Sequence, residues 1–209
     1  MRMQTTLCSP IGPSQSGTLF IERDTFDEVI NYAQAADKFE ICGYLLVKRL
    51  GPMAFTVLEN SLHIPLQLAG IGASETLPEG EAAQMDREDD TDDDTYRLLW
   101  HSHVNGQAGF SSTDLDTHAS FGRTTMFDAV FFMVVNQHGD ASANLELYRP
   151  FRLGTQLRLV VLEPYEETDL TPYKAIIKQF CLPYPPKKPR PYVRVINSTA
   201  ASIMEEGIE

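Results

Sequence analysis

The sequence predicts one α/β domain built on a mixed β-sheet. Its segments follow the order strand, helix, strand, strand, and then strand, helix and three strands, an order that predicts helices packed against such a sheet. Of the 209 residues, 43% are hydrophobic and 22% are charged, as in a globular protein with a sizeable core. We expect this domain over roughly residues 18–163, after a loose lead-in at 1–17 and before a C-terminal extension at 164–209.

A short strand and an amphipathic helix are expected at the start of the domain. Residues 18–22 are the strand candidate, and Asp24 or Thr25 can cap a helix that runs to about Ala36. Apolar residues recur along this helix at the spacing of one buried face: Phe26, Val29, Ile30 and Ala33. Two strand candidates follow, a largely apolar one buried on both faces and, after a Gly-Pro turn, a shorter one: residues 40–50 and 53–58.

The pattern weakens between residues 60 and 95, where scattered glycines and prolines precede a run of acidic side chains. Seven acidic residues and Arg87 lie between positions 86 and 94, and together they carry half of the net charge of −12. We predict a solvated, mobile acidic loop over residues 80–95, because blocks of like charge repel one another. A loop that binds a divalent cation is the alternative, although the run lacks the glycine that an EF-hand loop needs.

Four strands and one helix are expected in the second half of the domain, the helix at 111–121 and the strands at 96–101, 127–136, 143–148 and 157–162. The sequence His138-Gly139-Asp140 predicts a hairpin turn between the second and third of these strands. Beyond the domain, residues 171–180 favour one short helix. The proline-rich segment at 182–192 favours an extended, semi-rigid chain.

Composition and charge exclude several classes of protein. A chain this acidic repels phosphate backbones, so we do not expect nucleic acid as a partner. The longest apolar stretch, Ala129–Val135, is too short to cross a bilayer, and the N-terminus lacks the apolar centre of a secretory signal. Cys8, Cys42 and Cys181 are odd in number and far apart, which is typical of reduced thiols in a cytoplasmic protein.

A metal site is predicted by the sequence WHSHVNGQAGFSSTD. His101 and His103 are separated by one residue at a strand end, so both imidazoles point to the same face and can converge. Ser111 and Asp114 follow after a loop whose two glycines let the chain fold back toward the histidines. Two imidazoles and one carboxylate make a zinc site with three protein ligands, which leaves a fourth position for water.

The same residues also have a less specific interpretation. Histidines at a strand end often make only local hydrogen bonds, and Ser111 with Asp114 three residues later is an adequate helix cap. A chance match to H-x-H-x7-S-x2-D is about one in a few thousand at these residue frequencies, which favours the metal site. Hydrolysis also needs a general base, for which Glu40 at the start of an apolar strand is the candidate. An exposed strand end is the alternative for Glu40.

Glu40 followed by Ile-Cys-Gly-Tyr-Leu-Leu, Asn60 after the next strand, and His101-Ser-His103-x7-Ser111-x2-Asp114 together resemble the JAMM/MPN+ zinc metalloproteases, in their prokaryotic JAB form. The resemblance spans roughly residues 18–163. It implies a cytidine-deaminase-like α/β/α sandwich with a mixed central sheet. It also implies zinc-dependent hydrolysis of peptide or isopeptide bonds, typically in conjugates or precursors of ubiquitin or a ubiquitin-like protein.

The resemblance further implies a role for each residue of the site. His101, His103 and Asp114 match the ligands of one catalytic Zn²⁺, Glu40 matches the general acid/base, and Ser111 matches the residue that steadies the tetrahedral oxyanion. A ubiquitin-like partner would deliver an extended C-terminal tail along a strand edge. The chain departs from the family at position 104, where valine stands in place of the frequent proline, and in its lengthened acidic loop.

The sequence also leaves alternative functions open and contains other candidate residues. A non-catalytic MPN scaffold is one alternative, although such relatives generally lack the metal ligands, and a peptidase acting on another peptide or amide is a second. His118 is expected to pack or to lie at the surface rather than to support the neighbouring Asp114. Cys42 is expected to be a buried structural thiol, and His63 and His138 carry no functional signal.

Overall fold

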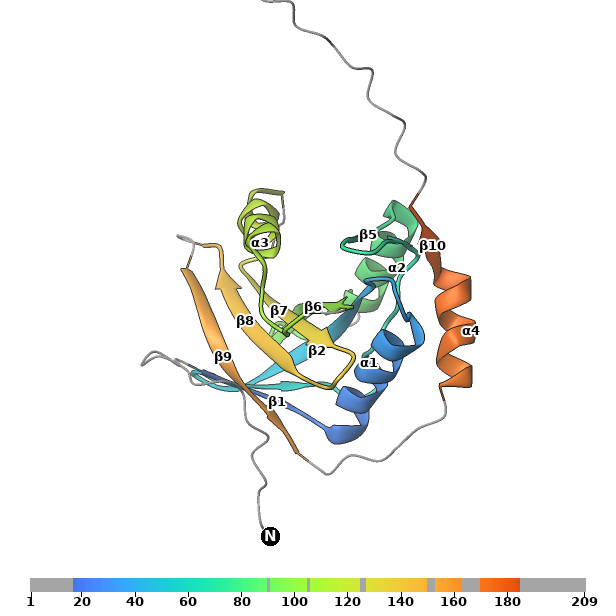
Figure 1. Ribbon diagram of the computed structural model, residues 1–209. Helices are drawn as coiled ribbons and strands as arrows, with labels where there is room; N and C mark the ends of the chain where they lie inside the picture. Colours follow the sequence, from blue (N-terminus) through green and yellow to red (C-terminus); the bar gives the residue numbers. More distant parts are fainter. Residues whose placement is uncertain are drawn as a thin grey trace, which may run out of the picture.

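Seven strands of a mixed sheet close into a barrel in the computed structural model, which describes residues 17–89, 91–104, 106–124, 127–149, 153–162 and 170–184 (Figure 1). The order around the barrel is β1–β3–β2–β6–β7–β8–β9, and β9 pairs with β1 to close it. The bounds are Gly17–Ile21 for β1, Cys42–Gly51 for β2, Ala54–Val57 for β3, Thr95–His103 for β6, Ala129–Asn136 for β7, Ala141–Leu147 for β8 and Leu153–Val161 for β9. β1 is parallel to both of its neighbours and β6 is parallel to β7, whereas the remaining pairs are antiparallel.

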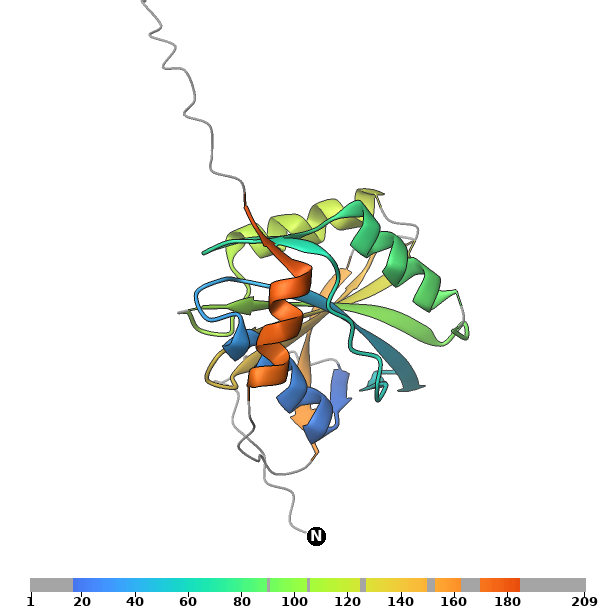
Figure 2. The same cartoon turned by 90° about the vertical axis from the view of Figure 1, so that its right-hand side faces the viewer.

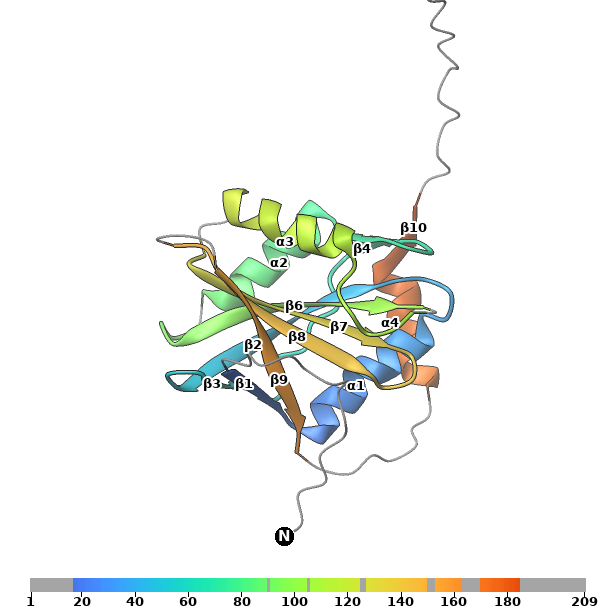
Figure 3. The same cartoon turned by 60° about the vertical axis from the view of Figure 1, so that its left-hand side comes forward.

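Helices cover the barrel on two sides. On one side lies α1 (Arg23–Ala35), with α4 (Thr171–Phe180) packed beside it so that Tyr173 meets Tyr32 edge-on at 5.0 Å between ring centroids (Figure 2). On the other side lie α2 (Pro78–Glu88) and α3 (Ser112–Thr124) (Figure 3). The predicted α/β class with a mixed sheet is confirmed. The finer expectation of a cytidine-deaminase-like α/β/α sandwich stays a prediction, and the sequence did not anticipate that the sheet closes on itself.

The core follows the hydrophobic patterns of the sequence. The predicted apolar face of α1 is buried, and β7 is buried along nearly its whole length because the barrel interior lies on one face and helices lie on the other. Pairing between β2 and β6 depends on one glycine. A Cβ atom at Gly43 would lie 2.5 Å from the indole nitrogen of Trp100, so Trp100 can fill the core only because position 43 has no side chain.

A second, three-stranded sheet has the order β10–β4–β5, with β4 at Gln67–Ala69, β5 at Ser74–Thr76 and β10 at Cys181–Pro183. The predicted irregular loop is therefore wrong for much of the stretch 60–95, which contains β4, β5 and α2. Three-residue strands are too short to show a periodicity, and α2 buries only Gly80 and Gln84, so neither element has a hydrophobic pattern. Gly80 lets α2 approach the chain before β4, because a Cβ there would lie 2.5 Å from the carbonyl oxygen of Leu66.

The acidic stretch divides into a buried part and an exposed part. Glu88 ends α2 and forms two hydrogen bonds, of 2.6 and 2.7 Å, with the guanidinium of Arg97, whose side chain is only 1% exposed. Arg97 also pairs with Glu81. The prediction of a solvated loop is therefore wrong for Glu88, because a buried cation in β6 draws this carboxylate inward. The three aspartates at 92–94 are exposed, position 90 lies outside the described residues, and no metal-binding cluster forms among the described members of the stretch.

The start of α1 also differs from the prediction. Its N-cap is Glu22, which makes no side-chain capping bond, while Asp24 lies in the first turn and Thr25 is buried. β1 ends at Ile21, so the connection to the sheet, rather than the best capping residue, determines where the helix begins. Residues 1–16 of the predicted lead-in and the proline-rich segment from 185 onward lie outside the described residues, and the domain bounds 18–163 stay a prediction. Among the described helices, none has the length and apolar character needed to span a membrane.

Candidate metal centre

The last three residues of β6 provide two side chains of the site, His101 and His103, and one buried side chain between them, Ser102. Successive residues of a strand point to opposite faces, so His101 and His103 project together while Ser102 points inward and is buried. The amide N–H of Ser102 donates to the carbonyl oxygen of Ile41 at 2.9 Å, and the Ser102 hydroxyl oxygen accepts from the Ile41 amide at 3.1 Å. These bonds join the strand that bears the histidines to the segment that bears Glu40.

The third side chain, Asp114, comes from the first turn of α3. The hydroxyl oxygen of Ser111 accepts a hydrogen bond from the Asp114 amide at 3.2 Å, and the Asp114 carboxylate accepts one from the Ser111 amide at 2.6 Å. This reciprocal pair is a capping box, so Ser111 does cap the helix as the less specific interpretation proposed. Capping also fixes the carboxylate of Asp114 at the end of the helix that faces β6.

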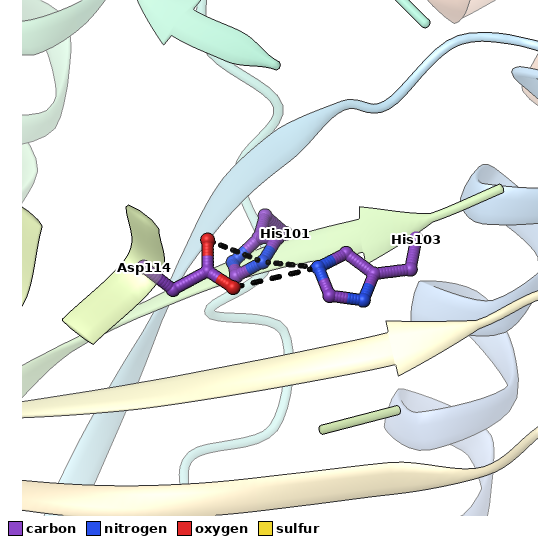
Figure 4. Close-up of side chains that lie close together, drawn as sticks. All are labelled: His101, His103 and Asp114. Carbon is purple, nitrogen blue, oxygen red and sulfur yellow. Dashed lines mark hydrogen bonds and ion pairs between the residues drawn. The ribbon is translucent and has the colours of Figure 1, made fainter. Parts of the chain in front are cut away.

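The three side chains point toward one another (Figure 4). The Nε2 atoms of His101 and His103 are 3.1 Å apart, and each lies 3.4 or 3.5 Å from one oxygen of Asp114. Two nitrogen ligands held about 2.0–2.1 Å from a tetrahedral Zn²⁺ lie about 3.4 Å apart, so the spacing fits that ion. Within the described part of the chain, no other group of three or more His, Cys, Asp or Glu side chains is close enough to hold a metal ion.

The electrostatics of Asp114 also suit a metal ligand. Burial is the largest single influence and raises the pKa of its carboxyl, but the hydrogen bond and charge attraction from His101 and the hydrogen bonds from Ser111 together outweigh it. The pKa of Asp114 is therefore held well below its usual range. A carboxylate that stays ionised suits a metal ligand, because metal binding requires the deprotonated form.

A backbone carbonyl selects the tautomer of His103. Its Nδ1 atom lies 3.2 Å from the carbonyl oxygen of Gln107, so Nδ1 carries the proton and Nε2 is left as the ligand atom. The loop itself is tied to the barrel by Asn136, a buried residue at the end of β7, whose amide donates to the carbonyl of Gly106 at 3.3 Å. The sequence did not predict the roles of Gln107 and Asn136. Gln107 acts through its backbone carbonyl, which any residue has, and Asn136 looks like the ordinary polar end of an apolar strand.

Glu40 lies two residues before β2, on the same side of the site as the histidines. Cys42 pairs with His101 in the antiparallel register, so the chain two residues earlier lies level with His103. Glu40 is only partly exposed, unlike a simple exposed strand end. Burial raises the pKa of its carboxyl, while His103 and His101 act in the opposite direction. A carboxyl with a raised pKa is better matched to proton transfer near neutral pH.

The remaining sequence candidates have structural roles. His118 is 2% exposed, stacks on Phe132 at 3.7 Å between ring centroids and meets Phe110 edge-on, so the expectation of a packing histidine is confirmed. The Cys42 thiol lies 3.4 Å from the side-chain oxygen of Gln67, and burial raises its pKa, as expected for a structural thiol. Cys42 and Cys181 are both free, whereas Cys8 lies outside the described residues.

Comparison with known proteins identifies the family. The family model described as prokaryotic homologs of the JAB domain matches residues 22–148, a range that contains Glu40, Ser111 and the three candidate ligands. None of the curated proteins gives a match. One solved structure that does match is the solution structure of a protein from Desulfitobacterium hafniense, at 15% identity and a TM-score of 0.45, over 71% of this chain and 96% of that one. The family model spans more than half of the sequence, so the resemblance is confirmed, and the chain belongs to the prokaryotic homologs of the JAB domain.

Proposed function

We propose that this protein is a zinc-dependent metallopeptidase of the JAMM type, which hydrolyses peptide or isopeptide bonds at the C-terminus of ubiquitin or a ubiquitin-like protein. One observation carries the proposal: two imidazole nitrogens and one carboxylate meet at zinc-like spacing within a JAB domain. The JAB family includes metalloisopeptidases, although its prokaryotic homologs are often non-catalytic. A complete ligand set with Glu40 on the same side of the site favours the catalytic class.

His101, His103 and Asp114 would hold the zinc ion, which would supply Lewis-acid activation of a water molecule and of the scissile carbonyl. Glu40 would accept the proton of the attacking water and pass it to the departing amine. Ser111 would stabilise the carbonyl oxygen as it becomes negative. Its hydroxyl oxygen accepts from the Asp114 amide, and its O–H, which also hydrogen-bonds the Asp114 carboxylate, would turn to donate to that oxygen.

The choice of substrate rests on the family resemblance and on the location of free strand edges. The barrel is closed, so its strands have paired neighbours on both sides. Among the described strands, the outer members of the small sheet, β5 and β10, therefore offer the backbone edges along which an extended tail could add. The cytidine-deaminase-like classification and a cytoplasmic location belong to the same proposal.

The test uses ubiquitin carrying a fluorogenic amine at its C-terminus, with an unrelated peptide amide as the second substrate. We expect the zinc-loaded protein to release the amine from ubiquitin, and Glu40→Gln to keep its zinc but to lose turnover by about 10²–10⁴-fold. Glu28→Gln is the matched control, because Glu28 is also a partly buried carboxyl whose pKa burial raises, but it lies on α1.

Each other outcome identifies a different function. Cleavage of the peptide amide alone would point to a peptidase with another substrate. Stoichiometric zinc with no cleavage of either substrate would point to a non-catalytic scaffold. A Glu40→Gln variant that lost its zinc would make Glu40 a ligand and contradict the roles given above.

A further inference from the structure

The segment Glu40–Cys42 is held from two sides. On the side of the metal ligands, Ile41 exchanges hydrogen bonds with Ser102. On the opposite side, the amide of Glu40 donates to the carbonyl oxygen of Gly70 at 2.7 Å, and this bridge joins the segment to the end of the small sheet. The position of Glu40 relative to the histidines is therefore set partly by a sheet that provides no ligand of its own.

Gln67 makes the second attachment to the small sheet, through its side chain. Its side-chain oxygen accepts from the Cys42 amide at 2.8 Å, and its side-chain nitrogen donates to the Cys42 carbonyl at 2.8 Å and to the Pro65 carbonyl at 3.2 Å. A single amide group thus bonds both backbone groups of Cys42, as a neighbouring strand would. β4 starts at Gln67, and this side chain extends the pairing from β4 to the chain that carries Glu40.

Because Gln67 is buried, its hydrogen bonds and not its size explain why a glutamine occupies this position. Gln67 is 0% exposed, and a buried amide is costly unless its donors and acceptor are bonded. An apolar side chain of similar size would fill the same space, but it would leave the Cys42 amide without this acceptor. A glutamine at this position therefore stabilises one particular placement of the Cys42 backbone.

The strand β10 pairs with β4, the strand that starts at Gln67. Cys181 pairs with Gln67 in the parallel register, and the amide of Tyr184 donates to the carbonyl oxygen of Ala69 at 3.2 Å. The Tyr184 ring also lies against Gly70, where an added Cβ would be 2.8 Å from the ring. The end of the described chain is thereby connected through β4 to the residue proposed as the general base.

We propose that Gln67 is a positioning residue that fixes Glu40 relative to His101 and His103. This inference rests on the proposed function and deepens it. A general base must lie within hydrogen-bond reach of the proton that it removes, and small displacements from reactive geometry cost about 100-fold in rate. Gln67 forms its hydrogen bonds with Cys42 and Pro65 and not with the candidate ligands, so it acts through the backbone of residues 40–42.

The test compares Gln67→Leu with Gln84→Leu in the zinc-loaded, full-length protein. Gln84 is the matched control because it is also 0% exposed and lies in the same part of the chain, but its amide bonds His63 and Glu88 instead of Cys42. We expect Gln67→Leu to raise the hydrogen-exchange rates of the Glu40 and Cys42 amides at least about tenfold, measured by NMR. Gln84→Leu should leave both amides protected.

Turnover and metal content provide the second measurement. Gln67→Leu should keep its zinc and lower kcat on the ubiquitin substrate by about tenfold or more, with KM within about twofold, because the Gln67 side chain bonds the segment that carries Glu40 and not the outer edges of β5 and β10. Gln67→Glu keeps the acceptor for the Cys42 amide while removing the donor to the Cys42 and Pro65 carbonyls, so it provides an independent result if the leucine variant does not fold. Its effect on the Cys42 and Glu40 amides should be smaller than that of leucine.

Two results would overturn the inference. One is unchanged exchange at the Glu40 and Cys42 amides in both Gln67 variants, and the other is faster exchange without any loss of kcat. Failure of the proposed function gives a different pattern, because the wild-type protein itself would then release no amine. The exchange comparison between Gln67→Leu and Gln84→Leu needs no substrate, so it still decides whether Gln67 fixes this segment.

Discussion

Ser111 and Asp114 hold each other across the first turn of α3, each accepting a hydrogen bond from the other's backbone amide. The residue proposed to stabilise the oxyanion is therefore also the residue that orients the candidate metal ligand. Capping uses the oxygen of the Ser111 hydroxyl, which accepts from the Asp114 amide, whereas stabilising an oxyanion would use its proton. The two roles can be separated experimentally.

Substituting Ser111 with alanine or glycine separates these roles. Ser111→Ala should lower the free energy of unfolding by about 1 kcal/mol through loss of the cap, whereas Ser111→Gly should cost only a few tenths because glycine is an acceptable N-cap. Both variants should keep zinc and lower kcat about 10²–10³-fold. Ser112→Ala, one residue later, is the control. An unchanged kcat in the glycine variant would leave Ser111 as a helix cap only.

Alanine at His101, His103 or Asp114 should remove the metal. The wild-type protein is expected to bind about one zinc per chain, and each single variant should fall to a small fraction of that value, because two ligands hold the ion too weakly. Metal analysis after expression with added zinc measures this directly. His138→Ala is the control, since His138 is exposed in the turn before β8. Zinc-free wild-type protein under these conditions would refute the metal site.

The lowered pKa of Asp114 predicts how the metal-free protein responds to acid. A carboxyl whose folded-state pKa is depressed stabilises the fold at pH values above its unfolded pKa, about 3.9, and loses that contribution as pH falls toward the folded value. Near pH 5 the Tm of the metal-free wild type should therefore exceed that of Asp114→Asn, and the difference should shrink below about pH 4. Thermal unfolding between pH 3 and 7 tests this. A difference that grew in acid would have the wrong sign.

Arg97 should matter far more for stability than the exposed Lys48, although each pairs with a carboxylate. Arg97→Met should lower the free energy of unfolding by about 3–5 kcal/mol, because it leaves the largely buried carboxylate of Glu88, at the end of α2, without its cation. Lys48→Met removes the surface pair with Asp92 and should change stability little. Chemical denaturation compares the two variants. Equal effects would mean that the Arg97 pair is no more than a surface contact.

The exposed aspartates before β6 are predicted to attract a basic partner surface. Deleting residues 86–94 would also remove Glu88 from Arg97, so the cleaner change is Asp93→Asn with Asp94→Asn. If these charges steer the substrate, kcat/KM should fall at low salt and approach the wild-type value at high salt, since screening weakens the attraction. If kcat/KM and its salt dependence stay unchanged, the charges contribute only to solubility.

The hydrophobic patterns of the sequence determined most of the main sheet and two of its helices. β7 is readable as a continuous apolar run that is buried on both faces, and α1 is readable from apolar residues at helical spacing. The spacing of His101, His103, Ser111 and Asp114 likewise predicted the site, because strand alternation and a helix start are local geometry. A local pattern is readable in a sequence when all its members lie within one or two adjacent elements.

Only the tertiary structure decided how distant segments hold that site. Gln67 and Glu88 look like ordinary polar residues, yet one bonds the backbone beside Glu40 and the other neutralises a buried arginine. Closure of the barrel by β1 and β9, and the small sheet that joins β4 to the C-terminal β10, also depend on pairing between residues far apart in the chain. Hydrogen bonds of this kind leave no periodic signal, because a polar side chain gains its partner only after the hydrophobic core has brought the two segments together.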